Sequence, residues 1–134
     1  MKRPVRPGAV EACTWYAGTD RELVSRALSD VGGDARIGVG LLELQPGCHT
    51  RPAHWHALEE EHLYVLSGEG ELHLGDETHR LEAGDYVCFP AGQAVLHHLS
   101  NSGHEAFRYL MIGERIAEDR VTHERDFTAA DDPT

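Results

Sequence analysis

Short apolar segments separated by turn residues recur from residue 36 to residue 112, and this pattern restricts the possible folds most. The eight segments are Arg36–Leu44, Pro52–His56, Glu61–Ser67, Gly70–Leu74, Thr78–Leu81, Asp85–Phe89, Val95–Ser100 and Ala106–Ile112. The breaks between them are rich in glycine, proline, asparagine and aspartate, and pairs such as Gly75-Asp76 favour tight turns. No helical segment interrupts the series, which argues against a parallel sheet with crossover helices. The pattern predicts an all-β sandwich or barrel.

The stretch 19–31 supports two predictions. Thr19 and Glu22 have the spacing of a capping box, and the apolar residues that follow fit one face of a helix that ends at Gly32-Gly33. The same stretch also fits a strand with alternate residues on one side. Local rules favour the helix, and both predictions remain open at this point.

A length of 134 residues fits one domain that can bury a core. We expect an N-terminal arm over residues 1–19, a barrel over 20–113 and a polar extension over 114–134, with a frayed end. The apolar fraction of 40% and the charged fraction of 26% are typical of a globular protein in water.

Charge and cysteine content indicate the setting of the protein. The formal net charge of −11 argues against nucleic acid or an anionic membrane surface as the main partner. The three cysteines, Cys13, Cys48 and Cys88, are odd in number and form no CxxC pair, which favours reduced thiols and a cytoplasmic location. We expect neither a signal peptide nor a membrane-spanning segment.

The segment from Pro52 to Glu61 contains the strongest functional signal. His54 and His56 would lie on one face of a strand, because side chains two residues apart point the same way. Glu61 could join them only if the chain turns after His56 and begins a new strand near residue 61. Two imidazoles and a carboxylate suit a divalent transition metal, so the spacing predicts a metal site. The run Glu59-Glu60-Glu61 leaves the choice of carboxylate open on spacing alone.

Two sets of residues resemble the motifs of the cupin superfamily. The first is Gly47, His54-Trp55-His56, Glu61 and Gly68, and the second is Gly84, Pro90-Ala91-Gly92, His97 and Asn101. The chain is also similar to a narrower branch of small bacterial single-domain cupins in Tyr64-Val65-Leu66-Ser67-Gly68 and His97-His98-Leu99-Ser100-Asn101. The resemblance covers about residues 26 to 113.

The resemblance implies a jelly-roll barrel, the double-stranded β-helix, with few or no helices, and it favours a strand over 22–28. It also implies one divalent ion (Fe, Mn, Ni, Zn or Cu) inside the barrel, held by His54, His56, Glu61 and His97. The step to Gly68 selects Glu61 among the three glutamates, and the step to Asn101 selects His97 over His98. Homodimers are common in this family, often through strands of the N-terminal part.

Cupins include enzymes of many classes as well as binding proteins, so the resemblance leaves the reaction open. The first hypothesis is a metalloenzyme, an oxygenase, isomerase or lyase, acting on a small polar organic molecule. The alternatives are a non-catalytic small-molecule or metal-binding module, such as a sensor, and a barrel held by structural zinc. Arg51, beside the metal motif, is a candidate for binding a substrate carboxylate or phosphate, or for pairing with a nearby glutamate.

Overall fold

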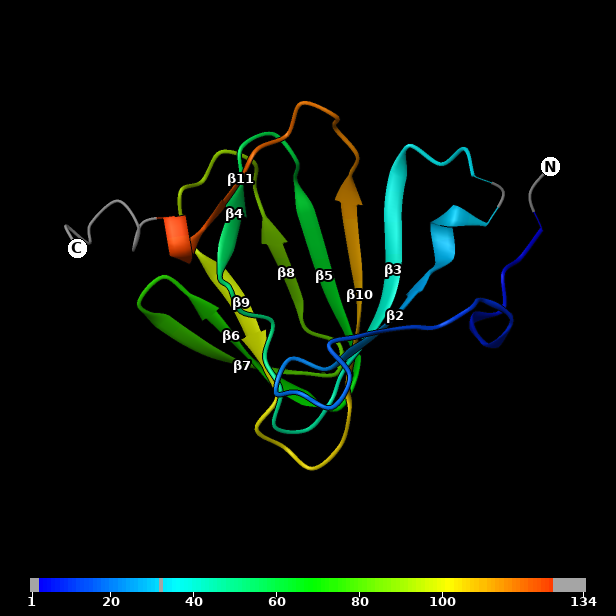
Figure 1. Cartoon of the computed structure of the whole chain (residues 1–134), viewed down its shortest axis with the longest axis horizontal. Coiled ribbons are helices and arrows are strands. Elements are labelled where there is room, and N and C mark those ends of the chain that lie inside the picture. The colour runs from blue at the N-terminus through cyan, green and yellow to red at the C-terminus, as the bar shows by residue number, and fades with distance from the viewer. Residues whose placement is uncertain (1–2, 32, 127–134) are drawn as a thin grey trace.

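The computed structural model describes residues 3–31 and 33–126, and this part of the chain is nearly all β (Figure 1). Two short 3-10 helices, η1 (Pro7–Ala9) and η2 (Leu28–Asp30), accompany the strands. The strands are β1 (Cys13–Trp15), β2 (Leu23–Ala27), β3 (Ile37–Leu44), β4 (His54–His56), β5 (Glu61–Ser67), β6 (Glu69–Leu74), β7 (Glu77–Glu82), β8 (Tyr86–Phe89), β9 (His97–Ser100), β10 (Phe107–Glu114) and β11 (Val121–His123).

The strands form two antiparallel sheets. One has six strands in the order β1-β2-β3-β10-β5-β8, and the other has five in the order β11-β4-β9-β6-β7. In Figure 1, β3, β10, β5 and β8 stand side by side, with β4, β9, β6 and β7 to their left. Neighbouring strands are often distant in sequence, as in a jelly roll, so the predicted all-β fold is confirmed.

The core lies between the two sheets and follows the alternation along each strand. In β5, Leu63 and Val65 are fully buried, whereas Tyr64 and Leu66 face the solvent with 43% and 37% exposure. Phe107 and Tyr109 of β10 pack their rings together in the same core, with ring centroids 5.1 Å apart. Each fully buried side chain of this size stabilises the fold by roughly 1.5–3 kcal/mol.

All eight predicted segments form strands, but the helix favoured by local rules over residues 19–31 is wrong. Leu23–Ala27 is strand β2, which pairs with β1 on one side and β3 on the other. The residues of the expected helix cap instead close the turn before the strand. The Glu22 carboxylate accepts a hydrogen bond from the Gly18 amide at 2.8 Å, and the Thr19 hydroxyl accepts one from the Arg21 amide at 3.2 Å. Sheet pairing therefore overrides the local helix preference.

Both flanking segments contribute strands. Strand β1, from the expected N-terminal arm, pairs with β2 at the edge of the larger sheet. Strand β11, from the expected C-terminal extension, pairs with β4 and so lies beside the metal motif. The frayed end expected after Phe127 lies outside the described residues.

Gly68 links β5 to β6 at a position that only glycine fits. Its φ angle of +76° lies in the left-handed region that side chains disfavour. An added Cβ would also press against the carbonyl oxygen of Ala106. The glycine of the sequence motif therefore has a structural reason, and it fixes how β5 leaves the core.

The described chain bears on two further expectations. Cys13, Cys48 and Cys88 are all free thiols in the structure. Within residues 3–31 and 33–126, no helix has the length and apolar character needed to span a membrane.

Candidate metal centre

Strands β4 and β5 bring the three residues of the first motif together. His54 and His56 lie on β4, and Glu61 begins β5 after a turn, as the sequence predicted. One donor atom from each of the three lies within 4.8 Å of the others. All three side chains are partly buried, so the cluster sits inside the barrel wall rather than on an open surface.

The Glu61 carboxylate is the central feature of the cluster. Its side chain is 18% exposed, and its Oε1 lies 2.9 Å from Nε2 of His56. This contact lacks the alignment of a hydrogen bond, and Oε1 accepts none from any residue in the described part of the chain. Burial alone would raise the pKa of Glu61, but the pairing with His56 and the nearby His54 and His97 lower it below its ordinary value. Glu61 is therefore a largely buried anion whose charge is balanced by the surrounding histidines.

A second carboxylate orients His56 from its other side. Asp119, in the loop between β10 and β11, places Oδ2 2.7 Å from Nδ1 of His56. Its other oxygen, Oδ1, accepts hydrogen bonds from the amides of Leu58 at 2.8 Å and Glu59 at 3.2 Å. The contact with Glu61 is the largest cause, and that with Asp119 a further cause, of a His56 pKa raised to about 9. Asp119 thus has the position of a carboxylate that fixes a metal-binding imidazole.

Strand β9 has two adjacent histidines, and His97 is the one that faces the barrel interior. It is 6% exposed, lies opposite His54 in the strand pairing, and has its ring centroid 4.7 Å from that of His54. Its ring also stacks on Phe89 at 4.0 Å. His98 instead stacks on His73, with ring centroids 4.3 Å apart. His97 thus borders the cluster, although its nitrogens lie outside the tight group formed by the other three residues.

The burial of His97 predicts a specific dependence of stability on pH. Burial, followed by repulsion from His54, lowers the pKa of His97 from 6.5 to about 4. The folded metal-free protein therefore resists protonation that the unfolded chain accepts. The resulting stabilisation is complete above pH 6.5 and is lost as the pH falls towards 4.

We expect the free energy of unfolding to fall over this window by up to about 3 kcal/mol from His97 alone. Urea unfolding of the metal-free protein at a series of pH values measures this effect. In the His97→Gln variant the free energy of unfolding should depend less steeply on pH between 6.5 and 4. The control His79→Gln, at an exposed position, should keep the pH dependence of the wild type. Equal slopes in the wild type and the His97→Gln variant would contradict the assignment.

The other residues of the glutamate run and His62 take different positions. His62 places Nε2 2.8 Å from Glu60 and Nδ1 2.5 Å from the Tyr86 hydroxyl, next to Cys88 on the neighbouring strand. Glu59 lies near His56 and Asp119. Glu60 pairs with His62, and Glu59 is not grouped with His54. Glu61 is therefore the glutamate that the structure brings to His54.

Two cavities border the cluster. A cavity of about 50 Å³ touches His56 and His97 and has room for only one or two water molecules. A cavity of about 220 Å³ reaches His54 and has room for a small organic molecule. Larger cavities of about 570 and 580 Å³ lie elsewhere and contain none of the four candidate ligands.

Sequence reasoning missed Asp119. It is a single aspartate in a polar segment, with no spacing that ties it to the histidines. Its role depends on β11 pairing with β4, which brings the end of the chain back to His56. The polar character of residues 114–134 gave no signal for this pairing.

Comparisons with known proteins agree with this architecture. Residues 40–113 match the family model described as the cupin domain. A structure from Acidithiobacillus ferrooxidans, provisionally named a sugar phosphate isomerase, is 32% identical, with a TM-score of 0.77 over 88% of this chain and 75% of that one. A sugar phosphate isomerase from a cupin superfamily of Silicibacter pomeroyi is 23% identical, with a TM-score of 0.82 over 91% and 82% of the two chains.

A third similar structure is the polyketide cyclase RemF from Streptomyces resistomycificus, 23% identical with a TM-score of 0.75 over 99% of this chain and 95% of that one. No curated protein matches the sequence. The fold and the cluster define a small jelly-roll protein with histidines and a carboxylate gathered in the barrel. The chain belongs to the cupin family.

Proposed function

We propose that the protein holds one divalent transition-metal ion between His54, His56, Glu61 and His97, and binds or transforms a small polar organic molecule there. The observation that carries the proposal is the convergence of His54, His56 and Glu61, whose donor atoms lie within 4.8 Å of one another on a partly buried carboxylate and two imidazoles. In the metal-free protein protonated His56 balances this carboxylate, and a divalent ion can take the place of that proton and bind the same oxygen.

The donor set fits such an ion. Three neutral imidazoles and one carboxylate suit Fe, Mn, Ni, Zn or Cu better than the oxygen-preferring Ca²⁺. His97 and His54 have lowered pKa values, so both are neutral and ready to donate a lone pair at pH 7. A bound ion would supply Lewis-acid or redox chemistry, and the chain would supply orientation through Asp119 and a pocket through the cavity at His54.

A small polar organic ligand agrees with the size of the cavity beside His54. It also agrees with the name of the 32% identical Acidithiobacillus protein, although that name describes that protein alone. The alternative function is a non-catalytic metal-binding or ligand-binding module, in which the same ligands hold an ion without turnover.

The test combines metal content with solvent access. Equilibrium dialysis against Mn²⁺ should give one ion per chain, and the loaded protein should enhance the relaxation of water protons, because a site with open positions exchanges water rapidly. A bound ion without enhancement would favour a closed structural site. Absence of binding by Mn²⁺, Fe²⁺, Co²⁺, Ni²⁺ and Zn²⁺ alike would overturn the proposal.

We also propose that the protein forms a homodimer through the outer face of the six-stranded sheet. Ile37, Tyr64, Leu66 and Tyr86 are exposed apolar side chains of this sheet, with exposures of 44, 43, 37 and 59%. Exposed apolar residues grouped on one face are typical of an interface. Light scattering should give twice the mass of the chain, and a monomer at all concentrations would refute the dimer.

A further inference from the structure

The cavity of about 220 Å³ beside the metal cluster is lined by several basic side chains. Its wall includes Arg21, His49, Arg51 and His123. His54, a candidate metal ligand, belongs to the same wall, so the cavity adjoins the metal centre. The whole chain has 23 aspartates and glutamates but only 12 lysines and arginines, so two arginines beside one cavity stand out against the overall charge.

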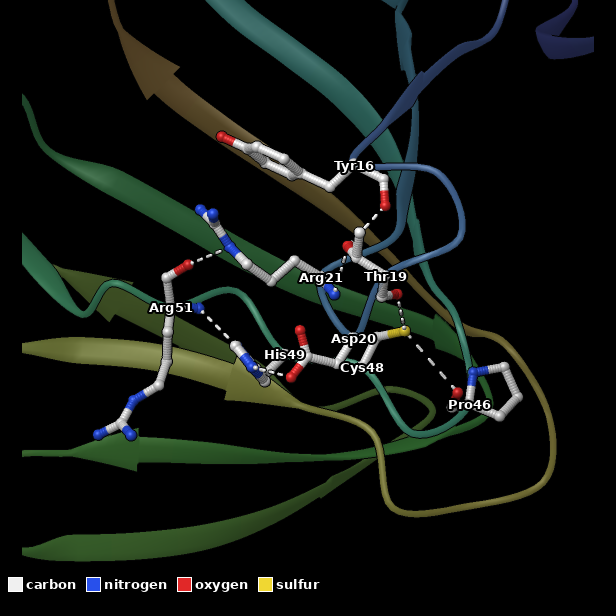
Figure 2. Close-up of polar contacts among 8 residues, drawn as sticks. All are labelled: Tyr16, Thr19, Asp20, Arg21, Pro46, Cys48, His49 and Arg51. Carbon is white, nitrogen blue, oxygen red and sulfur yellow. Dashed lines mark hydrogen bonds and ion pairs between the residues drawn. The ribbon is translucent and has the colours of Figure 1, made fainter.

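Three of these basic groups have carboxylate partners, and one of them is His123, whose Nδ1 lies 3.8 Å from Oδ2 of Asp126. The Arg51 guanidinium lies 3.3 Å from the Glu124 carboxylate. Nε2 of His49 lies 3.3 Å from Oδ2 of Asp20, and its Nδ1 accepts a hydrogen bond from the Arg51 amide (Figure 2). Their charge is balanced, or can be balanced, within the protein.

Arg21 differs because it is held in place without a carboxylate. Figure 2 shows its side chain between the Tyr16 ring and the Arg51 backbone. Its Nε donates a hydrogen bond to the Arg51 carbonyl oxygen at 2.9 Å, and its guanidinium carbon lies 4.0 Å from the centre of the Tyr16 ring. Over residues 3–31 and 33–126, no carboxylate forms an ion pair with it. The terminal nitrogens of Arg21 therefore remain as donors on a side chain that is already oriented.

A guanidinium fixed in this way is suited to a planar or tetrahedral anion. Its terminal nitrogens can bind two oxygens of one carboxylate or phosphate group, and pre-orientation reduces the entropy lost on binding. We propose that Arg21 binds the anionic group, a carboxylate or a phosphate, of the ligand that occupies this cavity. This inference deepens the proposed function, because it places the anionic end of the ligand at Arg21 and the remainder on the side of His54.

The test measures anion binding apart from metal binding. Titration calorimetry of the metal-free protein uses malonate as the carboxylate probe, inorganic phosphate as the phosphate probe and malonamide as the uncharged control. The wild type should bind at least one of the anions and not malonamide, and the preferred anion identifies the group. Repeating the titration with Mn²⁺-loaded protein shows whether the metal strengthens binding.

Arg21→Met should lower the affinity for the anion about tenfold to a hundredfold, the usual effect of losing a charged hydrogen-bond pair. Arg21→Lys keeps the positive charge but lacks the paired terminal nitrogens of a guanidinium, and it should give an intermediate loss of anion affinity. Arg80→Met removes the same charge from a distant, exposed position on β7 and should change little. Circular dichroism should confirm that each variant is folded.

Three results would overturn the inference: no binding of either anion to the wild type, equal affinity in wild type and both Arg21 variants, or equally tight binding of malonamide. Mn²⁺ stoichiometry distinguishes this failure from that of the proposed function. Loss of anion binding in Arg21→Met with one Mn²⁺ per chain retained is the expected result. An anion site in a protein that binds no metal would support Arg21 while refuting the metal centre.

Discussion

Glu61→Gln is expected to remove tight binding of a divalent ion while leaving the protein folded. Glutamine preserves the shape of the side chain but supplies a neutral oxygen in place of the anion beside His54 and His56. A neutral amide is a much weaker ligand for a transition metal than a carboxylate, and the three imidazoles would lack a counter-charge. We expect affinity for Mn²⁺ to fall by more than about a hundredfold, since even changes to residues behind the ligands cost ten- to a hundredfold.

The adjacent Glu60→Gln is the matched control, because Glu60 contacts His62 rather than the metal cluster. Metal content by elemental analysis after dialysis measures both variants. The metal-free Glu61→Gln protein should stay folded but be less stable than the wild type at pH 7, since protonated His56 loses its ion pair with Glu61. Unchanged metal content in Glu61→Gln, or equal losses in both variants, would contradict the role of Glu61.

Asp119→Asn is expected to weaken metal binding about tenfold to a hundredfold without changing the stoichiometry. Asparagine keeps an oxygen that can accept from the Leu58 and Glu59 amides, so the loop should retain its path. It loses the anionic oxygen at Nδ1 of His56, and imidazole orientation and basicity both depend on that contact.

The same variant has a readout that a purely structural role would not affect. In the metal-free wild type the His56 pKa is raised to about 9, so at pH 7 the ring carries a proton between Glu61 and Asp119. That proton must leave before His56 can bind a metal, and metal affinity should therefore rise with pH up to about 9.

In Asp119→Asn the His56 pKa, followed by NMR titration, should fall towards 6.5. Metal affinity should then level off at a lower pH. The exposed neighbour Glu118 gives the control Glu118→Gln. An unchanged His56 pKa, or metal affinity within twofold of the wild type, would show that Asp119 does not support the site.

The eight strands from β3 to β10 were predictable because each is a short apolar segment bounded by residues that favour turns. The helix expected over residues 19–31 failed for the opposite reason. Thr19 and Glu22 form local hydrogen bonds that a helix start and a tight turn share, and only pairing with β1 and β3 decides between them. A helix preference that rests on four consecutive residues carries no information about pairing with a strand farther along the chain, such as β3.

In the candidate site too, residues close in sequence could be predicted, whereas residues brought in from distant segments could not. His54, His56 and Glu61 are close in sequence, so strand geometry could bring them together before the fold was known. His97 rested on the family resemblance, and the sheet then showed that it faces His54 while His98 faces away. Asp119 and Arg21 could not be predicted, because each reaches the site through contacts between segments that are far apart in the chain.

Anomalous diffraction from zinc-loaded crystals tests the central claim most directly. We predict one strong peak per chain inside the barrel. It should lie about 2.0–2.2 Å from a nitrogen of His54, His56 and His97 and from an oxygen of Glu61. A peak bound elsewhere, or none within coordination distance of Glu61 and the histidines, would contradict the account of this barrel as a metal centre.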